Sequence, residues 1–356
     1  MPEHEIAAPL KPLAITQGDV AGIGPEIVAK VFRDSPGLTP GCFVVGSLEA
    51  MRRAARWIAK PGETSVPVAL IQSPQEAADV PPRCVPVLQL PGMAGELPAV
   101  GRVDARAGRW AGEAVEWAAR AAVAGDLAGL VTAPLHKEAL SAAGAPFDRY
   151  PGHTELLQAE AARFLGKGLG EVPVRMMLAN DELRTVLVSI HMSLRQAIAA
   201  VTFDNVLQTL QITHAALERM LGRPPRIGVA GLNPHAGEGG LFGMEEQTVI
   251  GPAIHAARGA GLDVHGPYAP DTIFMRARAH GAGRLGEFDV VVAMYHDQGL
   301  IPVKYLGVEQ GVNVTLGLPL VRTSPDHGTA FDIAGTGRAD PASLAAAIRM
   351  ARQLSR

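Results

Sequence analysis

The sequence contains very little cysteine. Only Cys42 and Cys84 occur among 356 residues, and they lie far apart in the chain. Neither a disulfide framework nor a cysteine-based zinc site is therefore indicated. This composition is typical of a protein that remains in a reducing compartment, and we predict a cytoplasmic location.

Long apolar runs and runs of like charge are also missing. No stretch of about 18 uncharged apolar residues occurs, and the N-terminus lacks the basic start of an export signal. The formal net charge of -3 gives no positive excess that could attract a nucleic acid or an anionic membrane. We therefore expect a soluble protein that binds small molecules, with no nucleic acid and no membrane among its partners.

Short apolar runs alternate with alanine-rich segments along the chain. Hydrophobic residues make up 47% of the sequence and charged residues 19%, as in ordinary globular proteins. Runs at 42–46, 127–134 and 288–296 predict strands, whereas 107–125 and 193–221 predict helices. The alternation predicts an α/β fold with mostly parallel sheets, and strands without strict period-two alternation suit a sheet buried on both faces.

Two loop-rich stretches, near 76–105 and 136–152, contain enough proline and glycine to be crossovers or boundaries. We predict one α/β domain from residues 1–140 plus 300–356 and a second from residues 141–299. Polar candidate residues fall mostly where apolar runs end, which is where open α/β sheets place their ligand crevice.

The segment GDVAGIGPEI, residues 18–27, follows a predicted strand and precedes a predicted helix. Pro25 suits the first helical turn, and the start of a helix can bind a phosphate or another anion. The glycine spacing fits neither the G-x-G-x-x-G dinucleotide pattern nor a Walker loop. From the pattern alone, a purely structural turn and a ligand-binding turn are equally good interpretations.

Four of the eleven histidines follow predicted strands or lie in tight polar loops: His153, His191, His235 and His296. Neutral imidazoles suit Zn²⁺ or a similar divalent ion, and open coordination positions allow Lewis-acid chemistry. A single histidine of this kind is more often structural. Four at one predicted sheet edge favour a metal site.

Basic residues and an amide are spaced among glycines and β-forming residues in the segment 304–337. Lys304, Asn313 and Arg322 together suit a phosphate or a carboxylate, with arginine as a bidentate donor. The alternative is that they are solvated surface residues. For Arg322 we favour a functional role.

Nine segments, in order and over nearly the whole chain, resemble the 4-hydroxythreonine-4-phosphate dehydrogenase family of vitamin B6 (pyridoxine and pyridoxal phosphate) biosynthesis. They are GDVAGIGPEI, VTAPLHKEAL, PGHTE, MMLANDELR, SIHMSLR, GLNPHAGEGGLFGMEE, GPYAPDTIF, YHDQGLIPVKYLG and GVNVTLGLPLVRTSPDHGTAFDIAGTG. The resemblance implies the two-domain isocitrate/isopropylmalate dehydrogenase-like fold, with an active-site cleft between the domains, and a homodimer. Val20 stands where this family usually has proline, from which we expect no change in chemistry.

Position by position, the resemblance implies that a divalent metal, Zn, Co, Mn or Mg, is bound by His191, His235 and His296. The domain 141–299 would contribute these ligands and the dimer contact. The implied substrate-binding residues, of which Asp271 would act from or near the dimer interface, are His153, Thr154, Lys304, Asn313, Arg322 and Asp271. The general base stays open between His153 and Lys137, which are candidates by position only.

The implied cofactor is NAD, with NADP as the alternative, on the side of the other domain. The segment DHGTAFDIAGTG is similar to the adenine-side loop of isopropylmalate dehydrogenases, and the opening glycine turn would line the cofactor cleft. The implied cofactor-binding residues are Gly18, Asp19, Gly22, Gly24, His327, Gly328, Thr329, Ala330 and Asp332.

The implied reaction is a metal-dependent oxidation of 4-hydroxythreonine 4-phosphate at C3, followed by decarboxylation to 3-amino-2-oxopropyl phosphate. Two relatives in the same family, which act on D-threonate or D-erythronate 4-phosphate, would share the same residues and remain the alternative. A non-catalytic ligand-binding homologue is a third interpretation, because a fold alone does not secure a function.

Overall fold

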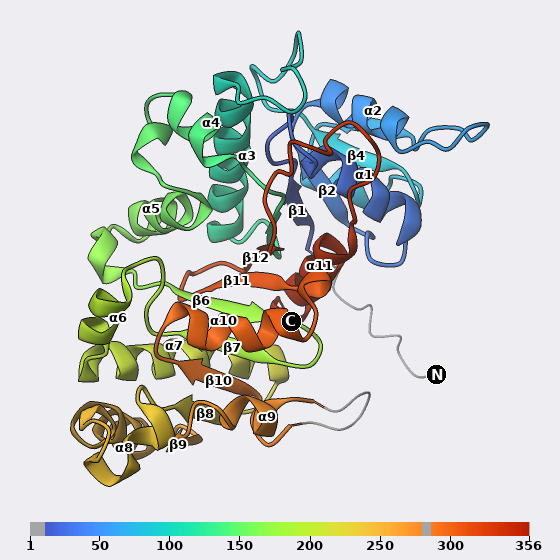
Figure 1. Ribbon diagram of the computed structural model, residues 1–356. Coiled ribbons are helices and arrows are strands. Elements are labelled where there is room, and N and C mark those ends of the chain that lie inside the picture. The colour runs from blue at the N-terminus through green and yellow to red at the C-terminus, as the bar shows by residue number, and fades with distance from the viewer. Residues whose placement is uncertain (1–10, 280–285, 356) are drawn as a thin grey trace, which may run out of the picture. The chain divides into compact units, whose positions relative to one another are not determined.

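The computed structural model describes residues 11–279 and 286–355. The chain forms two compact units (Figure 1). Unit 1 extends to Gly166 and includes the later segment His327–Pro341. Unit 2 comprises Lys167–Asp326 and the C-terminal segment from Ala342.

Unit 1 contains a parallel sheet in the order β3-β4-β2-β1-β5. Four of these strands are entirely buried, which explains why their sequences show no polar alternation. The strands are β1 (Leu13–Thr16), β2 (Cys42–Val45), β3 (Val68–Ile71), β4 (Val85–Leu88) and β5 (Gly129–Thr132).

Helices cover this sheet, with α1 and α2 packed against each other and α3 packed against α4 and α5. They are α1 (Gly24–Asp34), α2 (Leu48–Trp57), α3 (Ala105–Val123), α4 (Lys137–Ala142) and α5 (His153–Leu165), with 3₁₀ turns η1 (Pro74–Ala78) and η2 (Phe147–Arg149). Side chains of Ser47 and Asp104 accept hydrogen bonds from backbone amides and so cap α2 and α3. A Cβ on Gly108 would lie 1.9 Å from the Ala139 carbonyl oxygen, so glycine is what permits the close contact of α3 with α4.

The unit boundaries at 166, 326 and 341 differ from the predicted changes at 140 and 300. Helix α5 belongs with unit 1 because its buried Glu160 accepts a hydrogen bond from Arg120 of α3 at 2.8 Å. Residues 300–326 belong with unit 2 because β11 (Val312–Leu316) pairs with β6 (Arg175–Ala179).

The unit 2 sheet has the order β12-β11-β6-β7-β10-β8-β9. Strands β7, β10, β8 and β9 run parallel, whereas β12, β11, β6 and β7 pair in antiparallel fashion. The antiparallel part includes a tight turn in which Asn180 Oδ1 accepts from the amides of Glu182 and Leu183, both at 2.9 Å. The remaining strands are β7 (Arg184–Leu187), β8 (Ile227–Ala230), β9 (Val264–Tyr268), β10 (Val290–Ala293) and β12 (Arg322–Pro325).

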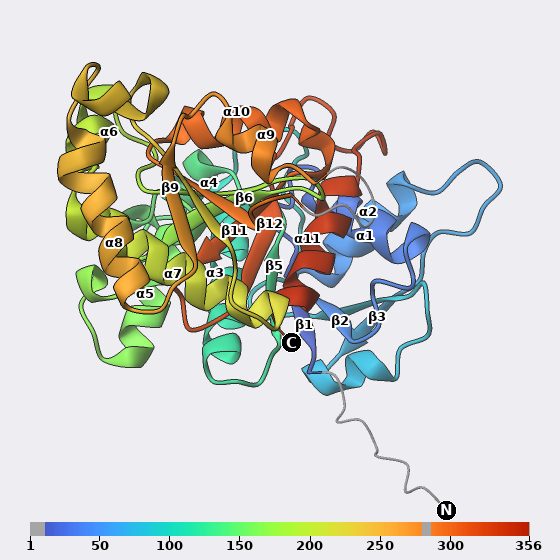
Figure 2. The same cartoon turned by 90° about the horizontal axis from the view of Figure 1, so that it is seen from below.

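Helices α9 and α10 lie on one face of this sheet (Figure 2). Helix α7 lies on the other face, where α8 and α11 pack against it. The predicted helix 193–221 is divided in two, because Thr202 caps a new helix. The helices are α6 (Leu194–Ala200), α7 (Phe203–Leu221), α8 (Gly251–Gly259), α9 (Ile273–Ala277), α10 (His296–Tyr305) and α11 (Ala342–Leu354), with short turns η3 (Leu169–Glu171), η4 (Pro234–Gly240), η5 (Glu246–Ile250) and η6 (Val308–Gln310). Among the described residues, no helix combines the length and apolar character needed to cross a membrane.

Candidate functional site

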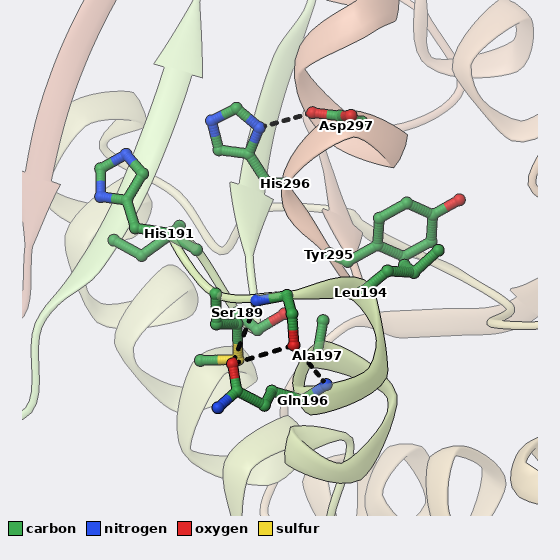
Figure 3. Close-up of a pocket in the computed structure, with 11 residues that line it drawn as sticks. Ser189, His191, Leu194, Gln196, Ala197, Tyr295, His296 and Asp297 are labelled. Atoms are coloured by element: carbon green, nitrogen blue, oxygen red, sulfur yellow. Dashed lines mark hydrogen bonds and ion pairs between the residues drawn. The ribbon is translucent and has the colours of Figure 1, made fainter.

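His191 and His296 approach each other at one edge of the unit 2 sheet. His191 follows β7 after a short connection, and His296 is the first residue of α10, directly beyond β10. Because β7 and β10 are parallel neighbours, their carboxyl ends meet at the same edge. The two ring centroids are 5.7 Å apart, so the fold brings together two of the three predicted metal ligands (Figure 3).

These two imidazoles line a pocket of about 580 Å³. His296 Nδ1 lies 2.7 Å from Asp297 Oδ1. An Nδ1–H that donates to this carboxylate leaves the Nε2 lone pair available for a ligand, which is how carboxylates commonly orient metal-binding histidines. The wall behind the pair is fixed by Ser189, whose hydroxyl donates to the Met294 carbonyl oxygen at 2.9 Å.

His235 opens a left-handed turn after β8. The φ angles of residues 235–239 are 54°, 53°, 81°, 42° and 67°, and three of these residues are not glycine. His191 also has a positive φ, of 32°. Left-handed backbone costs roughly 1–2 kcal/mol per non-glycine residue, and such strain persists chiefly at functional sites. Two of the three predicted ligands therefore carry the backbone signature of a constrained site.

His235 lines a second pocket, of about 690 Å³, next to the first. Tyr295 and Asp297 contribute to the walls of both pockets, and Asp271 lines the second. His235 is 64% exposed, and its Nδ1 lies 3.8 Å from Glu238 Oε2. Within residues 11–279 and 286–355, no three histidine, cysteine, aspartate or glutamate side chains stand close enough together to hold a metal ion. The fold thus places a close His191–His296 pair and a separate His235 in adjoining pockets.

The donor set nevertheless has the right chemistry for a divalent ion. Imidazole nitrogens are suitable ligands for Zn²⁺, Co²⁺ and Mn²⁺, and two imidazoles leave coordination positions open for a substrate. Asp271 and Asp297 add carboxylate oxygens to the same walls. These residues therefore fit a metal of the kind that the sequence predicts.

The predicted phosphate-binding residues of unit 2 are differently engaged. Lys304, in the last turn of α10, places its Nζ 2.5 Å from Asp326 Oδ2. Arg322 on β12 is 4% exposed and donates to the Thr315 hydroxyl at 3.1 Å, so the alternative of a solvated surface arginine does not apply to it. Asn313 and Thr315 are two residues apart on β11 and therefore lie on the same face of the strand. Thr315 is the register partner of Arg322 on β12, so Asn313 and Arg322 share that face.

Three predicted residues of unit 1 begin helices. Lys137 is the first residue of α4, and His153 and Thr154 begin α5. A Cβ on Gly152 would lie 3.7 Å from Lys137 Cε, so the two helix starts are neighbours. The two candidates for general base therefore lie close together within unit 1.

The opening glycine turn contacts the other predicted cofactor segment. The Ile23 amide donates to the Thr329 carbonyl oxygen at 3.0 Å, and a Cβ on Gly22 would lie 2.8 Å from Thr329. Gly18 has a φ of 70°, and a Cβ on Gly24 would meet the Gln17 carbonyl oxygen. Backbone conformation or close packing therefore explains why each of the three positions is glycine. The turn is therefore a tightly packed structural element that also borders the segment predicted to bind NAD.

Glu26 of α1 binds the later part of the same cofactor segment. Its buried carboxylate accepts from the amides of Gly335 and Gly337, the latter at 2.9 Å. Burial raises the pKa of Glu26, and the two amide donors oppose this shift. Of the other predicted residues in this segment, His327 Nδ1 lies 3.1 Å from the Gly328 carbonyl oxygen and Ala330 has a φ of 40°.

Asp19 is the most perturbed acid of the opening turn. It is fully buried, its Oδ1 accepts from the Ala21 amide at 2.8 Å, and its Oδ2 makes no hydrogen bond within the described part of the chain. Burial raises the pKa of Asp19 to about 6, although the Ala21 amide and then His136 lower it part of the way. A buried acid with one unsatisfied oxygen is suited to receive a polar group of a ligand.

Several residues of these walls escaped the sequence analysis. Asp297 directly follows His296, and a carboxylate next to a candidate metal ligand was a usable signal. Gln298 bridges two strand ends, because its carboxamide accepts from the Met294 amide at 2.7 Å and donates to the Gly231 carbonyl oxygen at 2.8 Å. Nothing in the sequence pattern marks that bridge.

Comparison with known proteins identifies the family. A family profile described as "Pyridoxal phosphate biosynthetic protein PdxA" matches residues 39–351. The chain belongs to the PdxA family. This membership confirms the resemblance read from the nine segments, and the predicted α/β fold class is confirmed with it.

Curated members of the PdxA family match over nearly their full length. A 4-hydroxythreonine-4-phosphate dehydrogenase of Beijerinckia indica is 51% identical, covering 96% of this chain and 95% of that relative. A D-threonate 4-phosphate dehydrogenase of Salmonella typhimurium is 43% identical, with 97% and 99% covered. The crystal structure of a 4-hydroxythreonine-4-phosphate dehydrogenase from Klebsiella pneumoniae superposes with a TM-score of 0.83 at 39% identity, covering 97% of this chain and 100% of that one.

Proposed function

We propose that this PdxA family member oxidises 4-hydroxythreonine 4-phosphate at C3 with NAD, and that decarboxylation then gives 3-amino-2-oxopropyl phosphate in pyridoxal phosphate biosynthesis. The protein is a dehydrogenase, as its close relatives are. The observation that carries the proposed substrate is the 51% identity over 96% of the chain to a relative named for it.

A second candidate substrate is D-threonate 4-phosphate, or its epimer D-erythronate 4-phosphate, in sugar acid catabolism. It is supported by relatives at 41% and 43% identity that are named D-threonate 4-phosphate dehydrogenases. Both candidates are small phosphorylated four-carbon hydroxy acids. They differ in the group at C2, which is an amine in one and a hydroxyl in the other.

His191, His235 and His296 are our proposed ligands for a divalent metal, with Zn, Co, Mn and Mg as candidates. Such an ion would act as a Lewis acid toward the substrate oxygens. In this assignment Asp297 Oδ1 would accept the Nδ1–H of His296 and leave Nε2 for the metal, and the short distance between the His191 and His296 rings supports it. The strained φ angles of His191 and His235 support this assignment.

Lys304, Asn313 and Arg322 are our proposed phosphate-binding residues in unit 2, with Asp271 at the pocket of His235. We retain His153 and Thr154 as substrate-binding residues of unit 1. The phosphate is remote from C3, so energy gained by binding it can orient the reacting carbon. For proton removal we retain His153 and Lys137, whose helix starts are neighbours.

The dinucleotide is assigned to the two unit 1 segments that meet at Gly22 and Thr329, with Asp19 buried beside them. NAD is the proposed cofactor and NADP the alternative. We further propose a cytoplasmic homodimer with its active site at or near the subunit interface. Exposed apolar side chains in unit 2 support this contact, among them Leu194, Leu241 and Phe242.

The deciding experiment measures initial rates of NAD reduction with 4-hydroxythreonine, D-threonate and D-erythronate 4-phosphates side by side. Each substrate is assayed after chelator treatment and again with added divalent metal. A higher kcat/KM for the amino substrate supports the first proposal, and a higher value for a sugar acid supports the second. Absence of turnover with all three would contradict both.

A further inference from the structure

A buried carboxylate lies directly behind the left-handed turn that carries His235. Glu246 is 4% exposed, and its Oε1 accepts from the backbone amides of Leu232 and Asn233, both at 2.7 Å. Its Oε2 accepts from Asn233 Nδ2 at 3.0 Å. Hydrogen bonds to an ionised acceptor are about twice as strong as neutral ones, so Glu246 fixes the two residues that lead into the turn.

The turn itself closes on the same carboxylate. A Cβ on Gly237 would lie 2.8 Å from Glu246 Oε2, and one on Gly231 would lie 3.0 Å from Oε1. Glycine at both positions lets the backbone pass close to the acid on either side. The Phe242 amide closes the loop by donating to the Gly237 carbonyl oxygen at 3.1 Å. The carboxylate is therefore the centre around which the turn is folded.

A left-handed turn with three non-glycine residues requires such external support, because its backbone is unfavourable by itself. Since His235 is the first residue of the turn, the direction of its side chain depends on the turn conformation. Glu246 accepts from the amides of Leu232 and Asn233, directly before the turn, whereas Glu238 lies on the exposed side, with its Oε2 3.8 Å from His235 Nδ1.

We propose that Glu246 is a positioning residue for metal binding: it touches neither substrate nor metal, but holds the left-handed turn so that His235 faces its pocket. This inference rests on the proposed function, in which His235 is a metal ligand. The proposed site then includes a residue, Glu246, that does not line either pocket.

Glu245 provides a matched control. It precedes Glu246 directly, carries the same charge, and its Oε2 accepts from the same Asn233 Nδ2 at 2.7 Å. It is only partly buried. Glu245→Gln therefore removes one charge and perturbs the same asparagine, while both backbone hydrogen bonds to Glu246 remain.

The test titrates Co²⁺ into the chelator-treated full-length protein and follows the visible absorption of the bound ion. Wild type, Glu246→Gln, Glu245→Gln and His235→Ala are compared, with a thermal unfolding curve for each. In Glu246→Gln the new side-chain nitrogen would replace the Oε2 atom that accepts from Asn233 Nδ2, so two donors would face each other. We expect its Co²⁺ affinity to fall about 10- to 100-fold, the usual range for residues that orient metal ligands, and to approach that of His235→Ala. Glu245→Gln should remain within about threefold of wild type.

If Glu246→Gln lowers the melting temperature but the folded protein binds Co²⁺ as tightly as wild type, Glu246 is only structural and the inference is overturned. Should Glu246→Gln fail to fold, Glu246→Asp retains the charge on a shorter side chain and should show the same loss. If the wild type itself binds no Co²⁺, the proposed metal site fails and takes this inference with it. The wild-type titration therefore separates the two failures.

Discussion

Lys304 and Asp326 form an ion pair across unit 2, with Nζ 2.5 Å from Oδ2. The lysine lies in the last turn of α10 and the aspartate directly follows β12. Lys304 is 43% exposed, so the pair itself contributes only about 0–1 kcal/mol to stability. The ion pair therefore matters less for stability than for holding the Lys304 ammonium group in one position beside the sheet.

If Lys304 binds the substrate phosphate, Lys304→Met should raise KM for the preferred four-carbon phosphate by roughly tenfold or more, since a charge-assisted hydrogen bond is worth about 1.5–3 kcal/mol. Steady-state kinetics at saturating NAD measures this. Asp326→Asn breaks the same ion pair but keeps the lysine, so its KM should stay within about threefold of wild type. Equal effects of both variants would assign the loss to the ion pair and not to phosphate binding.

Asp297→Asn should weaken metal binding by about tenfold, because an amide is a poorer acceptor for the Nδ1–H of His296 than a carboxylate. Competition with a chromogenic chelator measures the affinity. A second histidine–aspartate pair on unit 2 offers a matched control. His265 Nε2 lies 2.6 Å from Asp263 Oδ1. Asp263→Asn should leave the affinity unchanged, and a similar drop in both variants would point to a general charge effect.

Gly22→Ala should raise KM for NAD and leave metal affinity unchanged. The added methyl group would lie 2.8 Å from both Cβ and the carbonyl oxygen of Thr329, so the two predicted cofactor segments must separate. Gly37→Ala is the control, because a Cβ there meets nothing within 4 Å. An unchanged KM for NAD in folded Gly22→Ala would remove this contact from the cofactor site.

The stability of the protein should depend on pH through Asp19. Burial raises the pKa of Asp19 from 3.8 to about 6, so between these values the folded protein holds a proton that the unfolded chain has released. The free energy of unfolding therefore falls as pH rises through this window, and the penalty is complete above pH 6. A shift of about two units corresponds to about 3 kcal/mol as an order of magnitude.

Asp19→Asn should remove that slope and stabilise the protein most at pH 8. Urea unfolding at four pH values between 4 and 8 measures both effects, and Asp79→Asn, at an exposed position, serves as control. A slope that persists in Asp19→Asn would show that other groups cause it.

Much of the fold could be predicted because it depends on patterns local to the sequence. Apolar runs such as 42–46 and 288–296 became buried strands, and the histidine that ends the second run lies at a sheet edge because parallel strands end together. The family resemblance also depended on contiguous segments, and the comparisons confirm it.

Other features depend on contacts between distant residues or on backbone angles. The antiparallel part of unit 2 includes a turn stabilised by Asn180, and the partition of 141–166 is decided by packing of α5 on α3. Glu246 acts on amides 13 and 14 residues earlier in the chain. No hydrophobic period reports such bonds, so these residues could not be found from the sequence pattern.

The hydrogen bonds from Gly335 and Gly337 to Glu26 have a consequence for chimeric proteins. The chain leaves unit 2 at Asp326, contributes His327–Pro341 to unit 1, and returns at Ala342. A hybrid that exchanges only the N-terminal part with another dehydrogenase would separate an acceptor on α1 from its donors more than 300 residues later. Unit 1 is therefore transferable between proteins only as two segments inherited together.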